Sequence, residues 1–300
     1  MLNKSHLAAI SLIIVALGYS LLSIASRLLA LGFDDMTQVY MRIFFGLLIA
    51  MVILRKRISY KKFLNLKSKD IFWLMMMGVV GYTISVYFIT LSVLNTKLVN
   101  FAVIYSTIPL VAYFYSYFLL KKKINGTLIG LLFITMYGIL VMTSKSFIPS
   151  FGDFGIGEVY AVIAVLCAGF WSVGRKMLSK KLNNSEITVF VMIVATLVGF
   201  FISQLKGETI DIIAIRSNAL LVFIGLLLGS SLNMIASFLE NYAFEHIDAV
   251  LGNQILMLDS IFSLVVGYLF YNEVIGVTEL IGSAIILTTV VISNKVFLEK

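Results

Sequence analysis

Long apolar stretches separated by short polar segments run through all 300 residues of the chain. A helix needs about 20 mostly apolar residues to cross a bilayer, and an open sheet would leave backbone groups without hydrogen bonds in lipid. The pattern therefore predicts an all-α polytopic membrane protein. It has ten expected transmembrane helices, at residues 7–31, 36–54, 71–92, 98–120, 126–144, 157–177, 187–204, 219–242, 249–271 and 276–297.

The composition fits a protein whose solvent is lipid. Hydrophobic residues make up 60% of the chain and charged residues 13%, whereas about a quarter of the residues are charged in an ordinary soluble domain. A soluble enzyme, a nucleic-acid-binding module and a secreted disulfide-bonded protein are therefore excluded. Cys167 is the one cysteine, so neither an internal disulfide nor a thiolate metal site can form. We expect no cofactor, no metal and no nucleic-acid partner.

The positive charges predict an orientation in the membrane. The net charge is +8, and most Lys and Arg residues fall in alternate linkers, above all in 55–69. Basic linkers remain on the cytoplasmic side, so we predict a multi-pass protein of the cytoplasmic membrane with both termini inside. Apolar side chains alternate with the charges of the linker 55–69, which is expected to lie on the anionic inner leaflet.

The chain repeats itself at an offset of 151 residues. Gly78 aligns with Gly229, and weak matches at this offset recur across four consecutive pairs of predicted spans. The repeat predicts two units of five helices each, at residues 7–145 and 156–297. Since five crossings are an odd number, the second unit must enter the membrane from the opposite side. A five-plus-five inverted repeat of this kind is typical of secondary transporters.

The third to fifth spans of each unit carry a further pattern. Both Tyr87–Met142 and Phe238–Val291 follow an order of aromatic and small residues, an apolar span and then Gly. This pattern resembles the EamA type of the drug/metabolite transporter superfamily, with two EamA repeats that cover nearly the whole chain. The resemblance implies ten helices, cytoplasmic termini and alternating-access transport of small metabolites. Lys122 departs from the family's Glu after the fourth span, whereas Glu273 keeps that Glu after the ninth.

Pro109 lies in the middle of the predicted span 98–120. It cannot donate a hydrogen bond to the carbonyl of Tyr105, so we predict a kink there. The kinked helix fits a wall of a substrate cavity, and it fits a passive packing kink equally well. The repeat counterpart of Pro109 is Ser260, so the sequence gives no matching reason for a break in the span 249–271.

Two carboxylates fall inside predicted spans, where an ionisable side chain is costly and should face protein or water. Asp259 borders a polar stripe that includes Asn253. It can bind a cationic group, carry a proton, or hydrogen-bond a neighbouring helix. Glu240 shares a helix face with Asn233. For Glu240 a coupling role competes with snorkelling or pairing with a basic loop, and we favour the second interpretation.

Arg42 lies about one or two helical turns inside the outer end of the second span. Its long side chain can reach the interface from there. It can also pair with Asp34, Asp35 or Glu158 as an outer gate, or bind a substrate carboxylate. The interfacial role is the interpretation we favour.

Three aromatic residues are expected to line a central cavity. Tyr19 and Trp171 lie in mid-span beside Gly18 and Gly169, at nearly equivalent places in the two units, and Tyr82 belongs to a stripe of small residues. An aromatic lining favours planar or amphipathic substrates through stacking and cation–π contacts.

Two GxxxG motifs, Gly225–Gly229 and Gly126–Gly130, have the spacing that lets membrane helices approach closely. We assign both to helix packing.

Motifs for several activities are missing. The sequence has no P-loop, no zinc-protease or serine-hydrolase motif and no potassium filter. We therefore predict a protein that is not an enzyme but a secondary-active transporter. It would move small metabolites, such as amino acids, nucleosides or amphipathic drug-like compounds, by alternating access through a central cavity. Protons are a candidate coupling ion. The alternatives are a non-transporting scaffold or sensor and a lipid-modifying membrane enzyme, and the oligomeric state stays open.

Overall fold

The computed structural model describes residues 4–96, 101, 104–122, 126–148, 155–178, 181–271 and 274–298. Within these ranges the regular structure is helical, apart from one isolated bridge between Phe33 and Ile210. The helices are α1 (Lys4–Leu29), α2 (Asp35–Ile53), η1 (Arg55–Arg57), α3 (Tyr60–Leu64), α4 (Ser68–Met76), η2 (Met77–Ile84), α5 (Ser85–Asn95), α7 (Ile108–Leu120), α8 (Gly126–Ser144), α9 (Ile156–Met177), α10 (Asn184–Lys206), α11 (Ile212–Ser217), α12 (Ala219–His246), α13 (Ala249–Leu256), α14 (Asp259–Tyr271) and α15 (Val277–Leu298).

The lengths and surfaces of these helices fit a bilayer. Among the described residues, eight helical segments are long and apolar enough to cross a membrane, and two further apolar helices, in α7 and α15, are shorter. Large apolar side chains point outward, and Val52, Phe201 and Leu269 are 69%, 63% and 64% exposed. A surface of this kind is stable in lipid and not in water. The chain is therefore a polytopic helical membrane protein.

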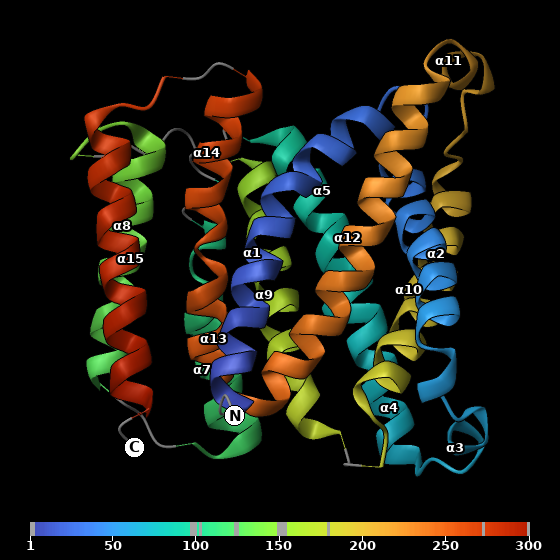
Figure 1. Cartoon of the computed structure of the whole chain (residues 1–300), viewed down its shortest axis with the longest axis horizontal. Helices are drawn as coiled ribbons and strands as arrows, with labels where there is room; N and C mark the ends of the chain where they lie inside the picture. Colours follow the sequence, from blue (N-terminus) through green and yellow to red (C-terminus); the bar gives the residue numbers. More distant parts are fainter. Residues whose placement is uncertain are drawn as a thin grey trace.

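The helices pack in pairs drawn from the two halves of the sequence (Figure 1). The α8–α15 pair forms one side of the bundle, the α2–α10 pair lies towards the other, and α1, α9, α12 and α13 lie between them. Extensive contacts join α1, the first helix of one half, to α12 of the other half. Likewise α9, the first helix of the second half, contacts η2 and α5 of the first half. Helix α7 packs against both α9 and α13, and α1 packs against α13 and α14.

The two ends of the bundle differ in charge. Helix α1 begins and α15 ends at one end, where η1 and α3 also lie, and α11 lies at the other (Figure 1). Lys62 pairs with Glu186 at 3.1 Å at the first end, which joins α3 to the start of α10. At the other end the Thr37 backbone N–H donates to Glu208 at 2.7 Å. Polar contacts thus connect the two halves of the sequence at both ends.

Two apolar spans are interrupted at corresponding places. The chain turns at Ser106–Thr107 before α7, and Pro109 lies in the first turn of that helix, where a missing N–H breaks no helical hydrogen bond. The second interruption, at Met257–Leu258, separates α13 from α14 and lies 151 positions later. This second break was not predicted, because the position of Pro109 is taken by Ser260 in the second half. It forms without proline, since the Met257 N–H is shared between two carbonyls at 3.3 Å each.

Glycines decide two of the helix contacts. A Cβ at Gly225 would lie 2.8 Å from the Leu28 side chain, so the predicted packing role of this motif is confirmed for α12 against α1. The assignment for Gly126–Gly130 is wrong, because no atom of the described residues lies within 4 Å of a Cβ at either position. Helix α8 instead meets α15 at Gly138, one turn or more away on a different face.

Candidate functional site

Glu240 is the acidic residue at the centre of a buried polar cluster. The residue is 3% exposed, and its carboxylate accepts hydrogen bonds from the Tyr19 hydroxyl and the Trp171 indole N–H, both at 2.8 Å. None of the described Lys or Arg residues forms an ion pair with it. The favoured prediction of snorkelling or loop pairing is therefore wrong. The carboxylate turns inward because α1 and α9 supply donors there.

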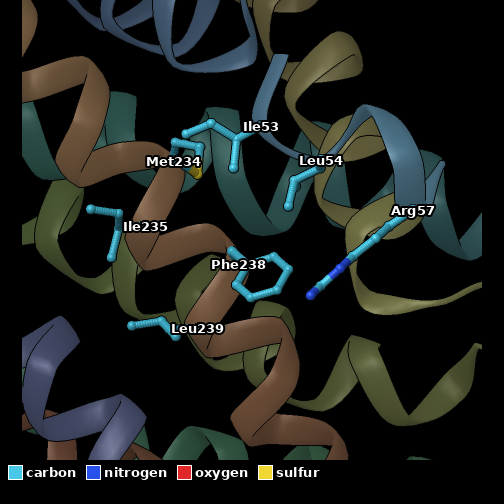
Figure 2. Close-up of a pocket in the computed structure, with 7 residues that line it drawn as sticks. All are labelled: Ile53, Leu54, Arg57, Met234, Ile235, Phe238 and Leu239. Atoms are coloured by element: carbon cyan, nitrogen blue, oxygen red, sulfur yellow. The ribbon is translucent and has the colours of Figure 1, made fainter. Parts of the chain in front are cut away.

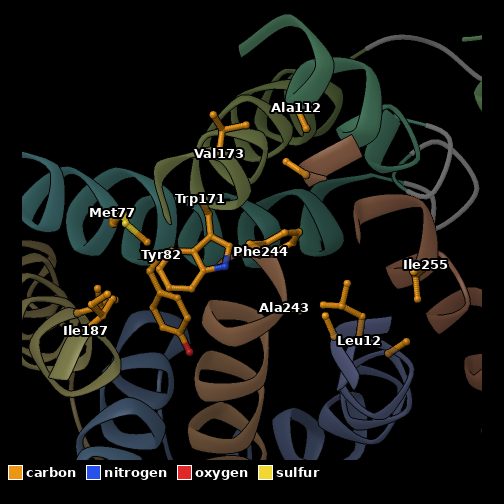
Figure 3. Close-up of a cluster of buried hydrophobic side chains, with 14 of the residues drawn as sticks. Leu12, Met77, Tyr82, Ala112, Trp171, Val173, Ile187, Ala243, Phe244 and Ile255 are labelled. Atoms are coloured by element: carbon orange, nitrogen blue, oxygen red, sulfur yellow. The ribbon is translucent and has the colours of Figure 1, made fainter. Parts of the chain in front are cut away.

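Trp171 and Tyr82 form the aromatic part of this cluster. Their ring centres are 5.4 Å apart with the planes inclined by 57° (Figure 3). A Cβ at Gly81 would lie 3.1 Å from the Trp171 Cα, so the glycine allows η2 to approach α9 this closely. The η2 segment is a π-helix, and such segments occur often at functional sites. The Thr83 hydroxyl closes the wide turn by donating to the Gly78 carbonyl at 2.8 Å.

Asn233 joins the cluster through Tyr82. The Tyr82 hydroxyl donates to Asn233 Oδ1 at 3.1 Å, and the two residues are 151 positions apart. They are therefore counterparts in the two halves of the sequence that touch each other. The Asn233 amide donates in turn to the Gly229 carbonyl at 2.7 Å, which fixes its orientation on α12.

Arg42 is a buried cation at the edge of the cluster. The residue is 4% exposed, and its Nη1 donates to the Ser26 hydroxyl at 2.6 Å. Its stem lies against α12, where a Cβ at Gly229 would be 2.7 Å from Arg42 Cδ. The Nε is buried and has no hydrogen-bond partner within the described ranges of the chain. The Tyr82 hydroxyl is close enough to interact electrostatically with both Arg42 and Glu240.

The favoured interfacial role of Arg42 does not agree with this burial. The outer-gate pairing is also not present, since none of the described carboxylates lies within ion-pair distance of Arg42. Asp34 accepts instead from the Thr209 backbone N–H at 2.8 Å, and Glu158 accepts from Gly155 N–H at 2.8 Å. The arginine turns inward because Gly229 leaves room for its stem.

The other predicted site residues lie around this cluster. The Asn253 amide donates at 2.8 Å to the hydroxyl of Ser172, the residue after Trp171. Asp259 is the first residue of α14 and accepts from the Ser263 hydroxyl at 3.2 Å, so it does not share the hydrogen bonds of Glu240. Pro109 lies on α7, which packs against α9 and α13. The cluster therefore brings together Tyr19, Trp171, Tyr82, Asn233 and Glu240.

Sequence reasoning missed Tyr105 as a member of the site. Its hydroxyl is within electrostatic range of both Asp259 and Glu240, so it lies near the two intramembrane acids. The residue immediately precedes the turn at Ser106–Thr107. Its position four residues before Pro109 was the available signal, because a proline frees the backbone of that turn and marks a change in helix direction.

Comparisons with known proteins agree with this architecture. Residues 6–144 and 155–295 each match the model of the EamA-like transporter family. An "Uncharacterized transporter" of Clostridium kluyveri is 26% identical over 302 residues, which cover 95% of this chain and 93% of the relative. A crystal structure described only as that of a protein has 15% identity and a TM-score of 0.75, over 96% of this chain and 98% of the other. Two family matches over nearly the whole length show that the chain belongs to the EamA-like transporter family.

Proposed function

We propose that the protein is a secondary-active transporter with ten transmembrane helices in a five-plus-five inverted repeat, residues 7–145 and 156–297. Three observations support this arrangement. The contact of α1 with α12 has its counterpart in that of α9 with α5 and η2, and the two broken spans are interrupted 151 positions apart. Tyr82 and Asn233, which are also 151 positions apart, bond to each other, as expected for residues on a two-fold axis.

The orientation in the proposal has both termini in the cytoplasm. Supporting it, the start of α1, the end of α15 and the basic segments η1 and α3 lie at the same end of the bundle (Figure 1). Basic segments remain on the cytoplasmic side of the cell membrane. The interface of the two units then lies in mid-membrane, where a central site can open to either side in turn.

The observation that carries the transport site is Glu240, a buried carboxylate with no cationic partner among the described residues. An isolated buried charge is costly, and the two neutral donors offset only part of that cost. A proton or the cationic group of a substrate supplies the rest. The aromatic faces of Trp171 and Tyr82 add cation–π attraction for an amine. Glu240 thus holds a proton or a substrate cation alternately, which couples substrate movement to a proton in the opposite direction.

Arg42 supplies the second pole of the site. It bonds Ser26 on α1, seven residues beyond Tyr19, so the two α1 positions that contact the charged groups are about 10 Å apart along that helix. Small amphipathic metabolites that carry an amine, with or without an anionic group at the far end, match this spacing. Amino acids and related amines are the first candidates, followed by nucleosides and drug-like cations.

The test is substrate flux in proteoliposomes with an imposed pH gradient and a panel of amino acids, amines and nucleosides. We expect a gradient-dependent flux for at least one amine, lost in Glu240→Gln and retained in Asp259→Asn. Flux that ignores the gradient and survives Glu240→Gln removes the coupling role. Absence of flux for the whole panel, in protein that is folded and inserted, favours a scaffold or sensor.

A further inference from the structure

A groove lies on the outer face of the bundle between the end of α2 and the segment 234–239 of α12 (Figure 2). Its volume is about 370 Å³. Ile53 and Ile235 on its walls are 63% and 39% exposed, so the groove opens to whatever surrounds the helices. Apart from one arginine, its lining is apolar and comprises Ile53, Leu54, Met234, Ile235, Phe238 and Leu239.

A second apolar hollow adjoins this groove along α2. Its volume is about 300 Å³, and Leu48, Ile49, Val52 and Ile53 line it. Since Ile53 lines both hollows, they form one apolar track from the end of α2 towards its middle. The second hollow extends the track by about 7.5 Å along α2, the rise of the five residues from Leu48 to Ile53. It therefore runs in the direction in which an acyl chain extends into a bilayer.

Arg57 is the charged residue at the mouth of the groove. Its carbonyl accepts a hydrogen bond from the Asn183 side chain at 2.7 Å, which ties the η1 turn to the start of α10. Its guanidinium points towards Phe238 (Figure 2). Within the described part of the chain, no carboxylate pairs with Arg57, whereas Lys62 of the same linker pairs with Glu186. The protein leaves the charge at the groove mouth without a counter-ion.

We propose that this groove binds an anionic phospholipid, with an acyl chain on the apolar track and the headgroup phosphate on Arg57. A guanidinium matches the geometry of a phosphate through two parallel hydrogen bonds. Exposed Arg55 and Lys56 in the same turn strengthen the positive field, and basic clusters at a membrane surface attract anionic lipids. The inference goes beyond transport and requires only that the bundle spans a bilayer.

The lipid would contact the helix that carries the candidate site. Met234 and Phe238 face the groove, while Asn233 and Glu240 on the same turns of α12 face the polar cluster. A lipid bound at the groove therefore stabilises α12 in the position that holds Glu240 against Tyr19 and Trp171.

Native mass spectrometry of the detergent-purified protein tests the headgroup contact. Phosphatidylglycerol and phosphatidylcholine with identical acyl chains are titrated separately. We expect the wild-type protein to bind phosphatidylglycerol more tightly than phosphatidylcholine. In Arg57→Gln, the ratio of the two affinities should fall about five-fold. Arg55→Gln is the matched control, since it removes the same charge from the same turn outside the groove. Equal binding of both lipids by the wild type, or equal losses in both variants, overturns the proposal.

A second variant tests the apolar track without changing charge. Ile235→Trp fills the groove from α12, and Ile235 is partly exposed, so the substitution does not alter the core. We expect weaker binding of both lipids with the headgroup preference retained. Unchanged binding of both lipids to this variant places the lipid elsewhere and rejects the groove as the site.

Discussion

Single residues in the polar cluster carry charge in a region where charge is costly. Among the described residues, Glu240 has only the neutral donors Tyr19 and Trp171 as partners, and the Nε of Arg42 has none. A protein that needed only stability would gain by replacing such groups with apolar side chains. The presence of Glu240 and Arg42 beside two aromatic rings fits a site in which a ligand supplies the missing partners of these charged groups.

The Trp171 indole N–H offers the sharpest test of the cluster. Trp171→Phe keeps an aromatic face but removes a hydrogen bond to a carboxylate, which is worth about 1.5–3 kcal/mol. We expect apparent substrate affinity in a counterflow assay to fall by about ten-fold or more.

Trp73→Phe is the control for this prediction. Trp73 is the other tryptophan and stacks on Phe170, with ring centres 5.9 Å apart, away from the hydrogen bonds of Glu240. A similar loss of affinity in both variants would mean that Trp171 acts only through packing.

The charge of Arg42 predicts a difference between substrates. Arg42→Gln keeps a donor for Ser26 but removes the positive charge. We expect transport of compounds with both an amine and an anionic group to fall several-fold, while transport of simple amines changes little, because only the first class has a group for the guanidinium. Measured fluxes that fall equally for both classes would assign Arg42 a structural role.

At the scale of helices, close approach depends on where side chains are absent. The α8–α15 pair meets where a Cβ at Gly282 would lie 2.5 Å from the Gly138 carbonyl oxygen, a backbone atom that cannot move aside easily. Two spans in the interior are instead interrupted by turns, at Ser106–Thr107 and Met257–Leu258. The peripheral pair is therefore rigidly packed, whereas the interior helices are segmented.

Glycine-to-alanine substitutions in these two helices distinguish the loss of a helix–helix contact from a change in intrinsic helix propensity. Gly282→Ala forces α8 and α15 apart and is expected to destabilise the protein by about 1–3 kcal/mol. Gly130→Ala, on the open face of α8, adds the same methyl group where nothing lies within 4 Å. Thermal unfolding in detergent, followed by circular dichroism, should show a lower Tm for the first variant only. Equal Tm values would contradict the α8–α15 contact.

The whole molecule is defined by how its two halves meet. Tyr82 with Asn233, and Thr135 with Thr289 through hydroxyls 2.8 Å apart, join the halves inside the bundle. The basic segments η1 and α3 lie at the end where α1 begins (Figure 1), which supports the proposed orientation. The proposed inverted repeat, with this charge distribution, would have a defined cytoplasmic side.

Cysteine labelling tests that orientation. Cys167 is buried, so Cys167→Ala gives a background in which exposed Ser68 or Ser217 can be changed to Cys. A membrane-impermeant maleimide should label the Ser217→Cys protein in intact cells, and the Ser68→Cys protein only after permeabilisation. Labelling of both proteins in intact cells would contradict the proposed topology.

The class of protein followed from the sequence alone, since the length of the apolar stretches and the low content of charge suffice to exclude water as the main solvent. The sequence also found the interruption at Pro109, because proline acts on its own turn. Residues at helical spacing, such as Asn233 and Glu240, were correctly placed on one face of α12. The domain limits and the count of ten spans stay predictions.

Which polar groups contact one another became clear from the packing of the helices. Glu240 turns inward because Tyr19, 221 positions away, and Trp171, 69 positions away, supply donors. Arg42 turns inward because Gly229 is small, and the break at Met257–Leu258 needs no proline. Patterns in the sequence report relations between residues a few positions apart. The partner of a buried polar group depends instead on how distant helices pack, and a single sequence does not show which distant residues come into contact.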